Sequence, residues 1–175
     1  ARIKNYLASI YNYQMQYDLS LKYYKEALTL VQELNFKPGI SAILTNLGDT
    51  YLSLKAYDSA IIYQRKALNI KKELGDKLGT GRVYNNLGNV FASPSTTANL
   101  DSANHYYQNG LEIAEEINDK NLKALSLYGL VRVYFMEGRF AEAEQLGNEL
   151  IGEVKIIQDL PLASRNRVPS RRLSC

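Results

Sequence analysis

The chain has 175 residues, of which 46% are hydrophobic and 22% are charged, and its formal net charge is +3. This composition excludes a disordered chain, and no run of about 20 apolar residues, the length needed to span a bilayer, occurs in it. The single cysteine, Cys175, excludes an internal disulfide framework and a cysteine-based metal cluster.

The positive charge is concentrated at the end of the chain. Four arginines follow Leu160, and no acidic residue accompanies them. Removing these four from the 21 basic residues leaves 17 bases against 18 acids in the rest of the chain. A body so close to neutral does not predict a nucleic-acid-binding surface.

Apolar residues at helical spacing predict eight helices, arranged as four hairpins, and no β-sheet. In chain order the expected ranges are about 2–14, 17–34, 40–53, 57–74, 79–92, 100–117, 121–136 and 140–157. Short breaks such as Leu54-Lys55-Ala56 separate the two helices of a hairpin. Gly or Asn at the end of a helix can take the left-handed conformation that stops it.

The hairpins repeat in the sequence. A shift of 40 residues superimposes Leu7, Leu47 and Leu87, and a shift of 43 extends the register to Leu130. The additional residues fall between positions 91 and 100, in a stretch with the composition of a loop. Self-similarity at a fixed period indicates stacked units that share a continuous core.

The repeated strings resemble a tetratricopeptide repeat. They are Asn46-Leu47-Gly48-Asp49-Thr50-Tyr51, Tyr57-Asp58-Ser59-Ala60 and Tyr63-Gln64-Arg65-Lys66-Ala67-Leu68, and Asn85-Asn86-Leu87-Gly88-Asn89 repeats the opening. The resemblance covers about residues 1–157, although the period is 40 rather than 34 and no proline closes each unit. It is nearest to long-repeat members such as kinesin light chains, spindle-orientation adaptors and the sensor regions of bacterial regulators.

The resemblance implies an all-α fold, an α-solenoid of four hairpins that forms a right-handed superhelix. The first helix of each hairpin would line the inner surface. We expect the repeat domain over residues 1–160, with units of about 1–37, 41–77, 81–120 and 124–160. A basic tail, 161–175, is expected to be disordered or to be a truncated fifth repeat, because Pro169 and Ser/Arg-rich residues replace the apolar stripe.

Polar side chains opposite the packing stripe of each first helix are candidates for ligand contact. Asn side chains both donate and accept hydrogen bonds, so a row of them can hold the amide groups of an extended peptide, and Arg can add carboxylate recognition. The predicted peptide-binding residues are Asn5, Asn12, Asp49, Arg82, Asn85, Asn89, Tyr128 and Arg132. For each of them, a solvated or structural role is the alternative.

The sequence does not favour catalysis. His105 is the only histidine, so neither a Ser-His-Asp arrangement nor a His/Cys metal set is available. Gly75, Gly79 and Gly81 form a connector that Arg82 follows, whereas a phosphate-binding loop would continue with Lys and Ser or Thr. We expect no enzyme activity, no cofactor and no metal.

The predicted function is that of a protein- or peptide-binding scaffold domain, with the ligand in a concave groove, inside a larger adaptor or regulatory protein. The expected partner is a peptide or protein, acidic rather than basic, with no nucleic acid and no membrane. Self-association as a homodimer through the exposed solenoid ends is one alternative, and a sensor segment of a bacterial signalling regulator is another. The compartment stays open: the cytoplasm is favoured, with the periplasm the alternative for a bacterial sensor.

Overall fold

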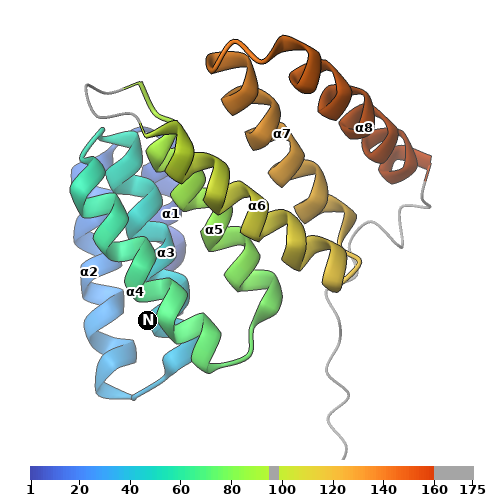
Figure 1. Cartoon of the computed structure of the whole chain (residues 1–175). Helices are drawn as coiled ribbons and strands as arrows, with labels where there is room; N and C mark the ends of the chain where they lie inside the picture. Colours follow the sequence, from blue (N-terminus) through green and yellow to red (C-terminus); the bar gives the residue numbers. More distant parts are fainter. Residues whose placement is uncertain (95–98, 160–175) are drawn as a thin grey trace, which may run out of the picture.

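Four helical hairpins stack one after another along the chain (Figure 1). The computed structural model describes residues 1–94 and 99–159, with side chains up to residue 155, so the expectations for the tail 161–175 lie outside the described residues. The described ranges form eight α-helices: α1 (Arg2–Tyr13), α2 (Tyr17–Glu33), α3 (Lys37–Ser53), α4 (Tyr57–Glu73), α5 (Lys77–Phe91), α6 (Leu100–Glu116), α7 (Lys120–Met136) and α8 (Phe140–Asp159). The prediction of an all-α solenoid of four hairpins is confirmed.

Two helices begin earlier than predicted: α3 starts at Lys37 and α5 at Lys77, rather than at about 40 and 79. Pro38 lies in the first turn of α3, where its missing N–H costs no helical hydrogen bond. At the start of α5, the Asp76 carboxylate accepts a hydrogen bond of 2.9 Å from the backbone N–H of Gly79. The predicted starts were wrong because proline and glycine disfavour helix interiors but not first turns.

Six helices are each followed by a single residue in the left-handed backbone conformation. These residues are Met15, Asn35, Lys55, Gly75, Asn118 and Gly138, with φ between 47° and 76°. Glycine and asparagine adopt this conformation readily, whereas Met15 and Lys55 adopt it against the steric preference of their side chains. The repeat geometry therefore imposes the turn even where the residue type does not favour it.

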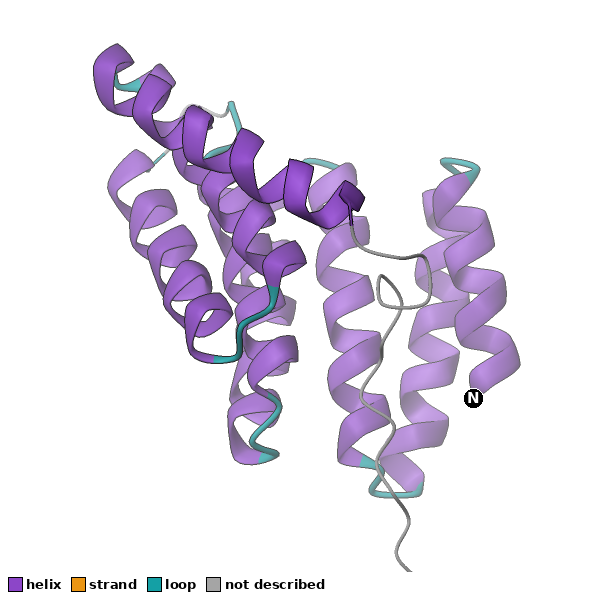
Figure 2. Cartoon of the chain, turned by 90° about the vertical axis from the view of Figure 1, so that its right-hand side faces the viewer, coloured by secondary structure: helices purple, strands orange, loops and turns teal. Residues whose placement is uncertain are grey.

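Three buried clusters fill the space between consecutive hairpins. The first joins α1, α2 and α3 around Tyr24, the second joins α3, α4 and α5 around Leu87, and the third joins α5, α6 and α7 around Tyr107. Each cluster draws on two hairpins, so no hairpin buries its apolar face alone. Short loops join the two helices of a hairpin where the structure describes the connection, as Figure 2 shows. In the part of the chain that the structure describes, no helix combines the length and the apolar character needed to cross a bilayer.

Candidate functional site

A hollow beside the first helices of the hairpins lies between α3, α5, α6 and α7 and has a volume of about 390 Å³. We call it the groove. Its lining residues are Thr45, Asp49, Arg82, Asn85, Asn86, Asn89, Tyr107, Leu125 and Tyr128. Five of the predicted binding residues are therefore brought together in the groove: Asp49, Arg82, Asn85, Asn89 and Tyr128.

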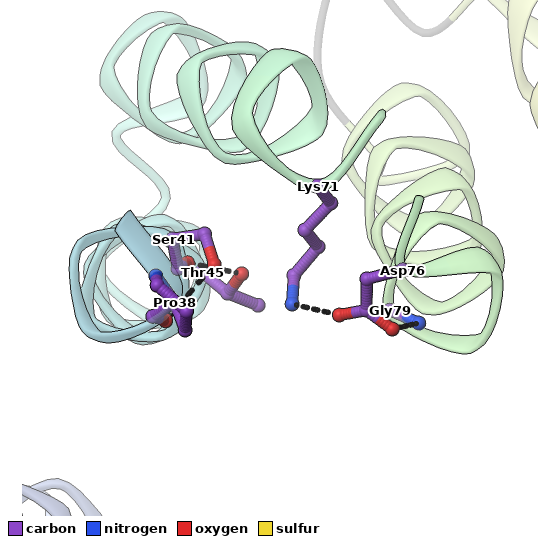
Figure 3. Close-up of polar contacts among 6 residues, drawn as sticks. All are labelled: Pro38, Ser41, Thr45, Lys71, Asp76 and Gly79. Carbon is purple, nitrogen blue, oxygen red and sulfur yellow. Dashed lines mark hydrogen bonds and ion pairs between the residues drawn. The ribbon is translucent and has the colours of Figure 1, made fainter. Parts of the chain in front are cut away.

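A second hollow, of about 300 Å³, adjoins the groove. Thr45 and Arg82 line both hollows, so the two follow one another along the surface between α3 and α5. In Figure 3, Lys71 extends from α4 toward Asp76 at the start of α5, and its ammonium lies 3.1 Å from the carboxylate. Because Asp76 neutralises Lys71, the second hollow has a weaker attraction for anions than its lysine suggests.

In each of the first three hairpins, a buried side chain of the second helix forms a hydrogen bond with a polar side chain of the first helix. The pairs occupy equivalent repeat positions, and they are Tyr24 with Ser9 (2.9 Å), Gln64 with Asp49 (2.6 Å) and Tyr107 with Asn89 (2.7 Å). Burial raises the pKa of Tyr107 to about 12, so its hydroxyl stays protonated and donates to Asn89. The second helices thus fix how the first helices present their polar groups.

The sequence reasoning missed Gln64, Tyr107 and Asn86. Gln64 and Tyr107 lie on second helices, whereas the site was expected on the first helix of each hairpin. A signal was present, because the position that holds tyrosine in α2 and α6 holds glutamine in α4, and a buried polar atom at a repeated position needs a partner.

Asp49 is the central polar residue of the groove. Its Oδ1 accepts hydrogen bonds from Gln64 Nε2 at 2.6 Å and from Asn86 Nδ2 at 2.8 Å. Burial raises the pKa of its carboxyl group to about 7, and the Gln64 hydrogen bond offsets part of that rise. Among the described residues no basic group lies within ion-pair distance of Asp49, so its charge is held only by neutral amides.

Asn85 and Asn89 differ in burial and in their hydrogen-bond partners. Asn85 is 6% exposed, and its Oδ1 accepts a hydrogen bond of 3.0 Å from the Ser126 hydroxyl, which joins α5 to α7. Asn89 is half-buried, and its Oδ1 accepts from Tyr107 and, at 3.5 Å, from Arg132 Nη1. The guanidinium of Arg132 also lies 5.8 Å from the centre of the Tyr128 ring. Asn85 is thus a bridge between helices, whereas Asn89 lies at the edge of the open groove.

Asn5 and Asn12 lie away from the groove, on α1. Asn46 Nδ2 donates to Asn5 Oδ1 at 3.1 Å, and Asn12 Nδ2 donates to the Thr50 hydroxyl at 3.0 Å. Both bonds join α1 to α3. The structure therefore places these two predicted binding residues in contacts between the first and second hairpins, apart from the other candidates.

In the described ranges, no group of three His, Cys, Asp or Glu side chains lies close enough together to hold a metal ion. The functional groups of the groove are amides, one carboxylate, one guanidinium and the hydroxyls of one threonine and two tyrosines. This set suits recognition of a polar chain through several hydrogen bonds.

Residues 1–73 match the model of the tetratricopeptide repeat family. No curated protein sequence matches the chain significantly. Among solved structures, BtubC from P. vanneervenii is similar with a TM-score of 0.78 and 22% identity, over 99% of this chain and 68% of that one. Aspartyl phosphate phosphatase F from Bacillus subtilis is similar with a TM-score of 0.83 and 18% identity, over 91% of this chain and 41% of that one.

A Rap protein complexed with Competence and Sporulation Factor is similar with a TM-score of 0.80 and 18% identity, over 89% of this chain and 43% of that one. The chain thus spans less than half the length of this protein and of the phosphatase. At these identities the likeness is one of fold. The eight described helices thus form an α-solenoid of hairpins similar to tetratricopeptide repeats, and the family model matches its first 73 residues.

Proposed function

We propose that the chain is a peptide-binding module that holds an extended segment of a partner protein in the groove. The observation that supports this most is the composition of the groove, in which oriented polar groups of α3 and α5 face Leu125 and Tyr128 of α7. Leu125 and Tyr128 are 56% and 55% exposed, so they are available to a ligand. Polar groups that are already fixed lose little entropy when a ligand binds.

The groove suits a ligand with main-chain amides and at least one carboxylate. Asn86 and Asn89 carry amide groups that can pair with peptide groups, and Arg82, which is exposed, can bind a carboxylate in a bidentate manner. We include the preference for an acidic peptide in the proposal on this basis. The module would work inside a larger adaptor or regulatory protein, a role supported by the greater length of the similar solved structures.

The proposed role is binding without catalysis. One similar structure is an aspartyl phosphate phosphatase, and this chain covers 41% of it. Incubation with acetyl phosphate, a small acyl phosphate, tests a phosphatase activity directly. We expect hydrolysis at the rate of the buffer alone, and a protein-dependent rate would contradict the non-catalytic role.

A random hexapeptide library tests the groove. The groove variant, Arg82→Ala/Tyr128→Ala, removes two exposed side chains that line it. The matched control, Ile62→Ala/Arg65→Ala, removes an exposed apolar side chain and an exposed arginine from α4. We expect the groove variant to bind the selected peptides at least about 10-fold more weakly, since a hydrogen bond to a charged group contributes roughly 1.5–3 kcal/mol. Equal losses in both variants would place binding elsewhere.

Self-association is a second candidate, and a stripe on α1 supports it. Ile3, Tyr6, Ile10 and Tyr13 lie on one side of α1 and are 76%, 62%, 52% and 90% exposed. The repeat equivalents of Ile3 in α3 and α5, Ile43 and Val83, are at most 3% exposed. Light scattering at increasing protein concentration would detect a dimer, which Ile3→Ser/Ile10→Ser should abolish. A monomer at every concentration would exclude this role.

A further inference from the structure

The charges that line the groove are one carboxylate, Asp49, and one guanidinium, Arg82. The two differ in burial, because Arg82 is exposed to solvent whereas Asp49 is mostly enclosed by the surrounding helices. A charge in solvent is stabilised by water, whereas an enclosed charge depends on the groups around it. Asp49 is therefore the charge whose stability responds most strongly to what enters the groove.

The two oxygens of Asp49 have different surroundings. Oδ1 accepts both hydrogen bonds, from Gln64 on α4 and from Asn86 on α5, and these bonds fix the plane of the carboxylate. Oδ2 accepts no hydrogen bond from the residues that the structure describes, and it is not among their fully buried unpaired atoms. Oδ2 is thus an acceptor without a partner among the described residues, on a side chain that lines the groove.

We propose that the groove selects peptides that carry a cationic nitrogen, an ammonium or a guanidinium, which binds Asp49 through Oδ2. This inference rests on the proposed function and adds the ligand group that its central residue recognises. A cation there supplies the missing countercharge and a charge-assisted hydrogen bond to an oxygen that is already in place. The aliphatic stem of a lysine or arginine side chain would lie along the apolar wall at Leu125.

Arg82 adds a preference for a carboxylate to the preference for a cationic group. It lines the same groove as Asp49, so a ligand that carries a cationic group and a carboxylate can pair with both. The acidic character expected of the partner and the cationic group proposed here are therefore compatible. The ligand is a peptide with both signs of charge within a few residues.

The cationic group has two sources in a peptide, its amino terminus and its lysine or arginine side chains. The test uses a hexapeptide library in two forms, one with a free amino terminus and one with an acetylated amino terminus. Each form is selected on the wild type, on Asp49→Asn and on Asp58→Asn. Asp49→Asn keeps the shape and an acceptor for Gln64 and Asn86, and Asp58→Asn makes the same charge change at an exposed site on α4.

We expect wild type and Asp58→Asn to enrich peptides with a cationic nitrogen at one position. Asp49→Asn should lose that enrichment and bind the selected peptides about 10- to 100-fold more weakly. Enrichment of lysine or arginine in the acetylated library assigns the group to a side chain, and retention of the free library but not of the acetylated one assigns it to the amino terminus. Both results support the proposal.

Two other results would overturn it. If the wild type retains both libraries equally and selects no lysine or arginine, or if Asp49→Asn keeps the wild-type preference, the inference about Asp49 is wrong while the proposed peptide site in the groove can stand. If the wild type retains no more peptide than Arg82→Ala/Tyr128→Ala, the proposed function fails and the inference fails with it. The two failures are therefore distinguishable.

The pH dependence of binding provides an independent readout. The charged or titratable groups that face Asp49 are Tyr24 on α2, Arg82 on α5, Tyr107 on α6 and Tyr128 on α7. An acetylated peptide whose cation is lysine or arginine keeps its own charge between about pH 6 and 8. Since the Asp49 carboxyl has a pKa of about 7, binding should tighten about 10-fold over this range, and only in proteins that retain Asp49.

Discussion

The buried ring of Tyr107 on α6 packs directly against the backbone of Gly129 on α7, so closely that a Cβ atom at position 129 would overlap the ring. Tyr107 is 1% exposed, and its hydroxyl is bonded to Asn89, so the ring has no room to move. One tyrosine thus sets the spacing between the third and fourth hairpins and also orients a groove residue.

We expect Gly129→Ala to destabilise the protein by about 1–3 kcal/mol, because overpacking a filled core forces side chains and backbone to shift. Gly147→Ala on α8 is the control, since an added Cβ there meets no atom within 4 Å. That control should gain about 0.5–1 kcal/mol from its better helix propensity. Urea unfolding of the three proteins measures both effects, and equal midpoints would contradict the packing described for Tyr107.

Tyr107→Phe keeps the ring but removes the hydrogen bond to Asn89. We expect a loss of about 1 kcal/mol in the free energy of unfolding. Peptide binding in the groove should also weaken, because Asn89 loses its anchor. Tyr6→Phe, at a residue that is 62% exposed, removes an equivalent hydroxyl from the surface and should change neither quantity. Thermal melts and peptide titrations on both variants provide the comparison, and unchanged binding by Tyr107→Phe would mean that Asn89 keeps its orientation without it.

Lys55→Gly should stabilise the protein by roughly 1 kcal/mol, because Lys55 has a φ of 58° in the turn between α3 and α4 and glycine adopts this conformation without steric cost. The reciprocal change, Gly75→Ala, places a side chain at a φ of 66° and should destabilise by a similar amount. The measurement is the melting temperature of each variant. A lower melting temperature for Lys55→Gly would show that the lysine side chain stabilises the fold by more free energy than its left-handed conformation costs.

The stability of the fold should depend on pH through Asp49. The carboxyl pKa is about 7 in the folded chain, against 3.8 as the ordinary value, so between about pH 4 and pH 7 the folded state holds a proton that the unfolded state has released. The free energy of unfolding therefore falls as the pH rises through this window. We expect Asp49→Asn to remove this decline, which amounts to roughly 2–4 kcal/mol, since one pKa unit corresponds to about 1.4 kcal/mol.

Urea unfolding of wild type and Asp49→Asn at pH 4.5, 5.5, 6.5 and 7.5 tests this linkage. The difference between the two proteins should grow in favour of the variant as the pH rises. Asp58→Asn serves as the control for loss of a charge, and its curve should run parallel to that of the wild type. A constant difference between wild type and Asp49→Asn would mean that the carboxyl is already ionised at the lowest pH.

The sequence predicted the architecture well because the same apolar and small residues recur at a fixed period, and stacked hairpins are the arrangement that buries such a pattern. Ala60, a small residue of the repeated strings, is fully buried. The helix starts at Lys37 and Lys77 were harder to predict from the sequence. They depend on Pro38, which is tolerated in the first turn of α3, and on Asp76, which caps the first turn of α5. The left-handed conformation of Met15 and Lys55 could not be predicted from their residue types. It follows from the packing of the two helices that each turn connects.

Which of the candidate residues lie together was predictable in part. Helical periodicity placed Asp49, Arg82 and Asn89 on the inner side of their helices, and the structure brings them into one groove. Periodicity does not reveal which gaps between helices stay open, so it did not separate these residues from Asn5 and Asn12, whose side chains form contacts between α1 and α3. Nor does it reveal hydrogen bonds from a second helix, which is why Gln64 and Tyr107 were missed.

Hydrogen bonds between the first helices of neighbouring hairpins would also respond to stretching of the solenoid. Asn46 bonds to Asn5, Asn86 to Asp49, and Arg132 to Asn89, so each junction between hairpins is crossed by at least one polar side-chain contact. If the array is stretched or its pitch changes, these contacts lengthen, and two of them end on groove residues. Tension along the solenoid would therefore act on groove residues through these side-chain bonds as well as through the apolar core, and a ligand in the proposed peptide site would act on the same bonds.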